Sequence, residues 1–213
     1  MAKIGNLGVG GEGYMIENME LELMEVKQKN GSVDGNFEIS ENEFDFNMGQ
    51  VISKFLSILL DYPTEEKIEK AKALAKFLCS YKEILPDYII ELATEVLNVN
   101  FSQDLQADYV EIFDFQTPPF ISFCVKGENQ NLILILDSIY LSEGVFVDET
   151  KLPDEFATVF EFLSLLYLRK RKEKINYMKE LLKPILHFPE PNHPLYEKVI
   201  KSVKRFIQSK FHD

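Results

Sequence analysis

Helix-forming stretches separated by prolines constrain this chain more than any other feature of its sequence. From Met48 onward, apolar residues recur at spacings of three and four, and prolines stand between successive stretches. Such spacing predicts amphipathic helices, and a proline ends one helix or opens the next because it lacks the backbone N–H and restricts the residue before it. The sequence therefore predicts an all-α fold, a single-domain helical bundle of about eight helices.

Capping residues and prolines give the expected start of each helix. Leu132 to Leu136 could also form a buried strand, but the apolar pattern continues to Tyr140 and Gly144 supplies a helix C-cap, so a helix is favoured. We expect helices to begin at Met48, after the caps Thr64 and Ser102, at Pro86, at Asn131, at Pro153, after the basic run 169–172, and at Asn192 or Pro194. The helix after the basic run is expected to extend to about Leu186.

Residues 1–46 differ from the rest of the chain. Half of the ten glycines lie between Gly5 and Gly13, and an acidic, weakly apolar stretch follows. Asn30-Gly31 and Asp34-Gly35 are turn dipeptides, so these residues form either a small hairpin or a mobile extension. The expected division is an N-terminal extension, 1–46, and an all-helical domain, 47–213.

Charge and cysteine usage exclude several classes of protein. The formal net charge is -12, which disfavours general binding to a nucleic-acid backbone. Cys79 and Cys124 have no CxxC spacing and suit a reducing compartment. The strongest apolar run is far shorter than the roughly 20 residues of a membrane-spanning helix. We expect a cytoplasmic protein with no nucleic-acid partner and no stable membrane association.

A search for catalytic motifs favours a binding role. Gly8–Gly13 satisfies GxGxxG but lacks the surrounding βαβ unit that makes this motif bind a dinucleotide. His187, Glu190 and His193 match no established zinc spacing and are better explained as part of a loop between helices. A phosphate-binding loop and a nucleophile elbow are also missing. The sequence predicts no catalytic residues, no metal site and no cofactor.

The stretch from 109 to 166 carries a resemblance to a known family. It contains Tyr-Val-Glu-Ile-Phe-Asp at 109–114, a polar-to-aromatic segment at 117–123, Leu152-Pro153-Asp154, and Glu161-Phe162-Leu163, in that order. With the Tyr-Pro stop at 62–63, these features resemble the TorD/DmsD/NarJ superfamily of molybdoenzyme maturation chaperones. Its NarJ-like branch, the assembly factors (delta subunits) of nitrate reductase, is the most similar. The resemblance spans about residues 48–190, and Glu155 stands where the superfamily often has His.

The resemblance implies a system-specific chaperone that is not an enzyme. Such proteins bind the N-terminal segment of an apo catalytic subunit of a molybdoenzyme and assist insertion of the molybdenum cofactor, holding no cofactor themselves. The alternative within the class is a chaperone that reads the twin-arginine leader of an exported enzyme of the dimethyl-sulfoxide-reductase type. From other classes, a small metal-dependent hydrolase and a structural helical subunit remain open.

The expected peptide-binding site is a groove between the helix that carries Tyr109 and the turn at 152–155. A helical domain can present such a groove to an amphipathic peptide, and acidic residues on the Tyr109 helix would face basic residues of the client. Tyr109 and Phe113 share a face because they are four residues apart, and Phe113 also suits the core. The full set of expected contact residues is Tyr109, Phe113, Pro118, Pro119, Phe120, Leu152, Pro153, Asp154 and Glu155.

Overall fold

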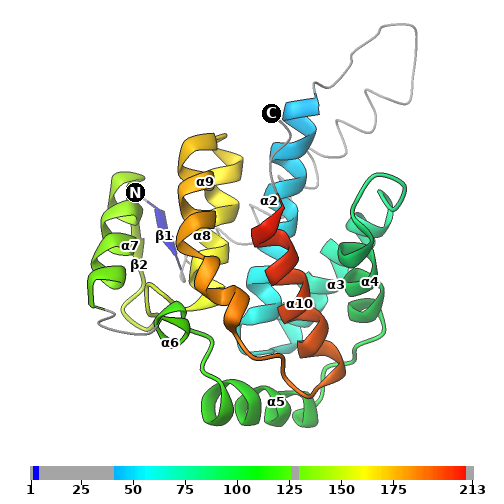
Figure 1. The fold of residues 1–213 in the computed structure, drawn as a ribbon. Coiled ribbons are helices and arrows are strands. Elements are labelled where there is room, and N and C mark those ends of the chain that lie inside the picture. The colour runs from blue at the N-terminus through cyan, green and yellow to red at the C-terminus, as the bar shows by residue number, and fades with distance from the viewer. Residues whose placement is uncertain (1, 5–40, 126–129, 210–213) are drawn as a thin grey trace, which may run out of the picture.

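The computed structural model describes residues 2–4, 41–125 and 130–209, with residues 2–4, 41–42 and 130 described by their backbone alone. Helices dominate the described chain, which confirms the all-α prediction, and two short strands accompany them (Figure 1). In chain order the elements are β1 (Ala2–Ile4), α2 (Glu41–Leu60), α3 (Glu65–Cys79), α4 (Asp87–Leu97), α5 (Gln103–Tyr109), the π-helix η1 (Val110–Gln116), α6 (Ile121–Cys124), α7 (Gln130–Ser142), β2 (Val145–Val147), α8 (Phe156–Leu168), α9 (Lys172–Leu181), the 3-10 helix η2 (Lys183–His187) and α10 (Pro194–Gln208).

Helices α2 and α8 pack along each other at the centre of the core. The Ser57 hydroxyl on α2 donates to the Ala157 carbonyl oxygen on α8 at 2.9 Å. Gly49 allows the close approach of Tyr167, because a Cβ atom at position 49 would lie 2.1 Å from a ring carbon of that tyrosine. Helix α10 packs against both α2 and α4, and α3 joins α2 to α4.

Local signals place the starts of two helices correctly. The Thr64 hydroxyl accepts a hydrogen bond from the Lys67 N–H at 3.2 Å, and the Ser102 hydroxyl accepts one from the Leu105 N–H at 3.1 Å. Each cap satisfies one of the backbone donors that a helix start leaves without a partner. Both N-caps are therefore confirmed.

The helix after Ser102 changes type within its length. It is α-helical to Tyr109 and then widens into the π-helix η1. At the end of η1 the Thr117 N–H donates to the Ile112 carbonyl oxygen, five residues earlier, at 2.8 Å. A π-helix is rare and is often found at a functional site. The apolar spacing of this stretch predicts one regular helix, so the π-helix differs from the sequence prediction.

Two predicted helix bounds are wrong, for identifiable reasons. Helix α8 begins at Phe156 and not at Pro153, because the preceding residues form a turn that bonds to another loop. The helix expected to run to about Leu186 ends at Leu181 and continues as η2. Pro184 lies at the start of η2 and cannot donate the backbone hydrogen bond that a continuing α-helix requires.

The start of the chain also differs from expectation. Helix α2 begins at Glu41, so helical structure extends into the segment assigned to the N-terminal extension. Strand β1 pairs in parallel with β2, a pairing that the sequence analysis did not foresee. The expected hairpin and the glycine motif Gly8–Gly13 lie outside the described residues.

Candidate peptide-binding surface

Two segments that carry the family resemblance meet in the structure. Residues 118–122 and 151–156, which we call the loop junction, form an antiparallel bridge between Phe120 and Glu155. The Phe156 N–H donates to the Pro119 carbonyl oxygen at 2.8 Å, so the first backbone donor of α8 has a partner outside its own helix. Backbone hydrogen bonds therefore hold together two loops that are more than 30 residues apart in sequence.

Asp154 has a structural position inside this junction. Its side chain is 1% exposed, and its carboxylate accepts a hydrogen bond from the Ser122 N–H at 3.1 Å. The Asp154 carbonyl oxygen accepts a second bond, from the Ile121 N–H at 3.0 Å. The residue thus binds the start of α6, where free backbone donors favour a negative charge. Asp154 does not present its carboxylate to a partner in this structure.

Tyr140 holds the same turn from the α7 side. Its hydroxyl donates to the Pro153 carbonyl oxygen at 2.6 Å, and its ring is 1% exposed. Burial, together with the nearby carboxylates of Asp137 and Asp154, raises the pKa of this phenol well above its usual value. The Tyr140 hydroxyl therefore stays protonated and remains a donor.

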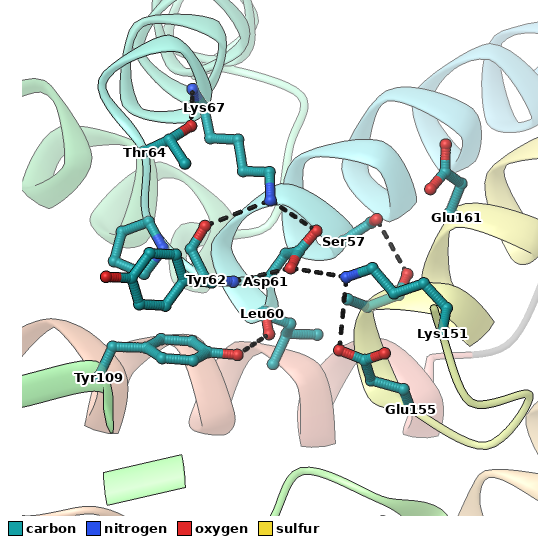
Figure 2. A network of polar contacts seen from close by, with 12 residues as sticks. Ser57, Leu60, Asp61, Tyr62, Thr64, Lys67, Tyr109, Lys151, Glu155 and Glu161 are labelled. Carbon is teal, nitrogen blue, oxygen red and sulfur yellow. Dashed lines mark hydrogen bonds and ion pairs between the residues drawn. The ribbon is translucent and has the colours of Figure 1, made fainter. Parts of the chain in front are cut away.

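A network of charged side chains lies beside the loop junction, where α2 ends (Figure 2). The Asp61 carboxylate contacts the Lys151 and Lys67 ammonium groups, each at 2.8 Å. Lys151 also lies 3.6 Å from the Glu155 carboxylate. Two cations and two anions thus join α2, α3 and the loop junction.

The pKa values of the two carboxylates of this network are shifted in opposite directions. Burial by itself would raise the pKa of Asp61, but hydrogen bonds from Lys151 and Lys67 outweigh it and hold this pKa below its usual value. Burial raises the pKa of Glu155, and the Asp61 charge adds to that rise against the opposing effect of Lys151. The fold therefore favours the ionised form of Asp61 and disfavours the ionised form of Glu155.

Tyr109 and Phe113 lie in the core beneath this network. Their rings are 4.9 Å apart, as their shared helix face predicts, but they are only 5% and 1% exposed. The Tyr109 hydroxyl donates to the Leu60 carbonyl oxygen at 2.9 Å (Figure 2). Burial and the charges of Asp61 and Glu155 raise the pKa of this phenol. Both aromatic residues support the surface from below, because their rings have little area left for a partner to cover.

The side chains available at the surface here are different ones. Leu152 is 52% exposed, and Tyr62, whose ring packs edge-on against Tyr109, is 40% exposed. Pro118 and Phe120 are half-buried, and so are Pro153 and Glu155, whereas Pro119 is buried. Of the nine residues expected to contact a peptide, Leu152 is therefore the most open, and Tyr62 is an addition.

The sequence analysis missed Asp61, Tyr62 and Lys151 as members of this surface. It had used Tyr62 only as part of the signal that ends the first helix. A usable signal was present, because Asp61 directly precedes that Tyr-Pro stop and Lys151 lies four residues before Glu155. What the sequence could not supply was the contact between these two turns, which are 90 residues apart.

The π-helix presents acidic and aromatic side chains outward. Glu111, Asp114 and Phe115 are exposed, and the exposed fraction of Phe115 reaches 81%. Asp108 on α5 lies 3.3 Å from His193, whose other ring nitrogen accepts from the Tyr196 N–H and caps α10. An exposed aromatic ring and exposed carboxylates on the same helix suit a peptide that combines apolar and basic residues.

The loop that holds His187 and His193 has other contacts. Glu190 pairs with Lys204 at 3.1 Å, and His193 caps α10 as described above. Among the residues that the structure describes, no three or more His, Cys, Asp or Glu side chains are grouped as a metal site requires. The helices described here also include none with the length and apolar character needed to cross a bilayer.

A shallow hollow lies elsewhere on the molecule, between α7 and α9. Its volume is about 550 Å³. Its lining combines three apolar and two polar residues of α7 with one tyrosine of α9: Asn131, Leu134, Ile135, Ser138, Ile139 and Tyr177. The sequence analysis had not singled out any of these residues as a site.

Comparison with known proteins shows a likeness of fold. The chain matches no protein-family model, and a search of curated proteins found no match. Among solved structures it is similar to the crystal structure of a candidate redox enzyme maturation protein from Archaeoglobus fulgidus. The TM-score is 0.56 and the identity 20%, over 84% of this chain and 98% of that chain. The two chains therefore share an all-α fold along most of their length.

Proposed function

We propose that this protein is a maturation chaperone for a redox enzyme, and more narrowly for the apo catalytic subunit of a nitrate-reductase-like molybdoenzyme. The observation that carries the proposal is the meeting of the family-like segments 118–122 and 152–155 at one surface, within a fold similar to that of a candidate maturation protein. In this role the protein binds the N-terminal segment of its client and assists cofactor insertion without catalysing a reaction.

The contacts at the loop junction suggest how the client is held. Leu152, Tyr62 and Phe115 offer apolar area to the peptide, while Glu111 and Asp114 attract its basic residues. Apolar burial would supply most of the affinity. The acidic side chains would mainly raise the association rate, so binding should weaken as salt concentration increases.

A tagged pull-down from the native host tests this proposal. The tagged wild-type chain should retain a molybdoenzyme catalytic subunit in its cofactor-free form, identified by mass spectrometry and metal analysis. The Leu152→Asp variant should retain at least fivefold less, because it places a charge on the exposed apolar surface. Ile84→Asp is the matched control, since Ile84 is also exposed but lies between α3 and α4.

Other recoveries would contradict the proposal in distinct ways. Recovery of the mature enzyme complex alone would indicate a structural subunit. Recovery of no protein by a folded chain would reopen the hydrolase hypothesis. A client with an intact twin-arginine leader would favour the alternative within the class. Equal retention by Leu152→Asp and Ile84→Asp would move the binding site away from the loop junction.

A further inference from the structure

The strand pairing between β1 and β2 is the feature with the clearest consequence beyond the loop junction. β1 runs parallel to β2, with Ala2 opposite Val145, Lys3 opposite Phe146 and Ile4 opposite Val147. β2 contacts α7 and β1 contacts α8, and β1 lies between these helices in Figure 1. The two paired strands are far apart in the sequence, since β1 covers Ala2–Ile4 and β2 covers Val145–Val147.

β2 is fixed in the domain by its own side chains. Gly144, with a φ of 69°, ends α7 and turns the chain into the strand. Val145 is fully buried, and Val147 packs against the core. β2 therefore has packing contacts in the domain besides its pairing with β1. The N–H and C=O groups along the edge of β2 that faces β1 need partners, and β1 meets this need in the structure.

β1 is a weak occupant of that edge. It is three residues long, and parallel pairing is slightly less stable per residue than antiparallel pairing. A two-stranded sheet is marginal without further packing. A second extended segment can therefore compete with β1 for the same hydrogen bonds.

We propose that the edge of β2 is a strand-acceptor site that binds an extended polypeptide segment, and that β1 is its internal competitor. Strand addition of this kind takes its affinity from main-chain hydrogen bonds and tolerates many side chains. The partner is an extended segment of the enzyme subunit that runs parallel to β2. The identity of that partner rests on the proposed function, whereas the acceptor edge does not.

Hydrogen exchange on a variant with a broken β1 tests the acceptor edge. Successive N–H groups of a strand point to opposite edges, so the donors to β2 are either Lys3 or its neighbours Ala2 and Ile4. Lys3→Pro together with Ile4→Pro removes at least one of these donors in either case. Lys3→Gln with Ile4→Val is the matched control, because it keeps both N–H groups. Amides of residues 145–147 should exchange at least tenfold faster in the proline variant than in the control. Amides around Phe55 in α2, a fully buried residue, should exchange equally in both.

A synthetic peptide of residues 1–8, MAKIGNLG, then serves as the probe in trans. Added in excess, it should restore slow exchange at 145–147 in the proline variant, and a labelled copy should bind that variant at least threefold more tightly than the wild type. The same peptide with prolines at positions 3 and 4 should do neither. Unchanged exchange in the proline variant, or failure of MAKIGNLG to restore it, would overturn the acceptor site.

The peptide assay contains no enzyme subunit, so its result is independent of the proposed function. If MAKIGNLG binds as expected but the pull-down recovers no client, the acceptor site stands and the chaperone function fails. If the client is recovered equally by the proline variant and its control, the chaperone function stands and the role of β2 in binding that client is refuted.

Discussion

The loop junction, with the charged network beside it, and α7 differ in the kind of side chain that they bury and expose. At the junction, charged side chains lie in partly buried positions, and each of Asp61, Lys151 and Glu155 contacts an opposite charge. On α7, apolar side chains lie in the open, with Leu134 66% and Leu141 54% exposed. The junction shows that burial of polar groups is tolerated when partners exist. α7 shows that an apolar sequence does not by itself bury a side chain.

Tyr140 connects these two regions, because it belongs to the inner face of α7 and bonds to the turn of the junction. Leu136 shares this inner position and is fully buried. α7 therefore has one face that supports the junction and one that is exposed. Changes on its two faces should have very different effects on stability.

The largest expected difference is between two leucines of α7. Leu136→Ala should lower the free energy of unfolding by about 3 kcal/mol, because it removes a fully buried side chain and leaves a cavity. Leu134→Ala, the matched control, should change it by less than about 0.5 kcal/mol. Urea denaturation monitored by circular dichroism would measure both. Similar losses would mean that the outer face of α7 is packed in solution.

Removal of the carboxylate of Asp61, at the centre of the charged network beside the junction, should come next. Asp61→Ala leaves the partly buried Lys151 with Glu155 alone, so we expect a loss of about 2 kcal/mol in the same measurement. The double variant with Lys151→Met should recover part of this loss, since the more buried of the two cations that pair with Asp61 is then absent. A double variant that loses as much as the sum of the two single variants would show that the contact contributes nothing.

The link between the two regions should have an intermediate effect. Tyr140→Phe keeps the buried ring and removes the hydroxyl bond to the Pro153 carbonyl oxygen, so we expect a loss of about 1.5 kcal/mol. Amides of residues 153–156 should exchange faster in this variant, while those of α2 should not. Unchanged exchange at 153–156 would show that α7 does not restrain the turn.

The smallest expected effect is at Glu155, and its sign depends on pH. The pKa of Glu155 is raised in the folded protein, so at a pH above this raised pKa the ionised carboxylate destabilises the fold. This destabilisation disappears as the pH falls from the raised pKa toward the unfolded value near 4.5. Glu155→Gln should therefore stabilise the protein slightly at pH 7, by less than about 0.5 kcal/mol, and show no advantage at pH 4. Asp61, whose pKa is lowered, contributes stability above its unfolded value near 3.8 that is lost only at lower pH. Thermal denaturation of wild type and variant at pH 4 and pH 7 would separate the two.

Much of the fold could be predicted because its signals are local. Thr64 and Ser102 cap their helices through bonds to residues three positions away. The helix over Asn131–Ser142 follows from apolar spacing and from Gly144, although a strand was an alternative. Such interactions are complete within a few residues of chain, so the sequence contains all the information that they need.

The site was less predictable because it depends on contacts between distant segments. The sequence grouped Tyr109 with Leu152, but burial separates them: Tyr109 bonds to Leu60 inside the core, and Leu152 lies at the surface. One of the two cations that pair with Asp61, Lys151, comes from a turn 90 residues further along the chain. No local sequence pattern predicts a contact between residues so far apart in the chain.

By itself, then, the sequence determined the all-α class and where most of the predicted helices start, because helical hydrogen bonds and caps close within four residues. The tertiary structure alone decided which aromatic rings were buried, where α8 began, which face of α7 was covered, and that β1 pairs with β2. Each of these features depends on which distant segment packs against a given surface, and such contacts form only when the whole chain folds.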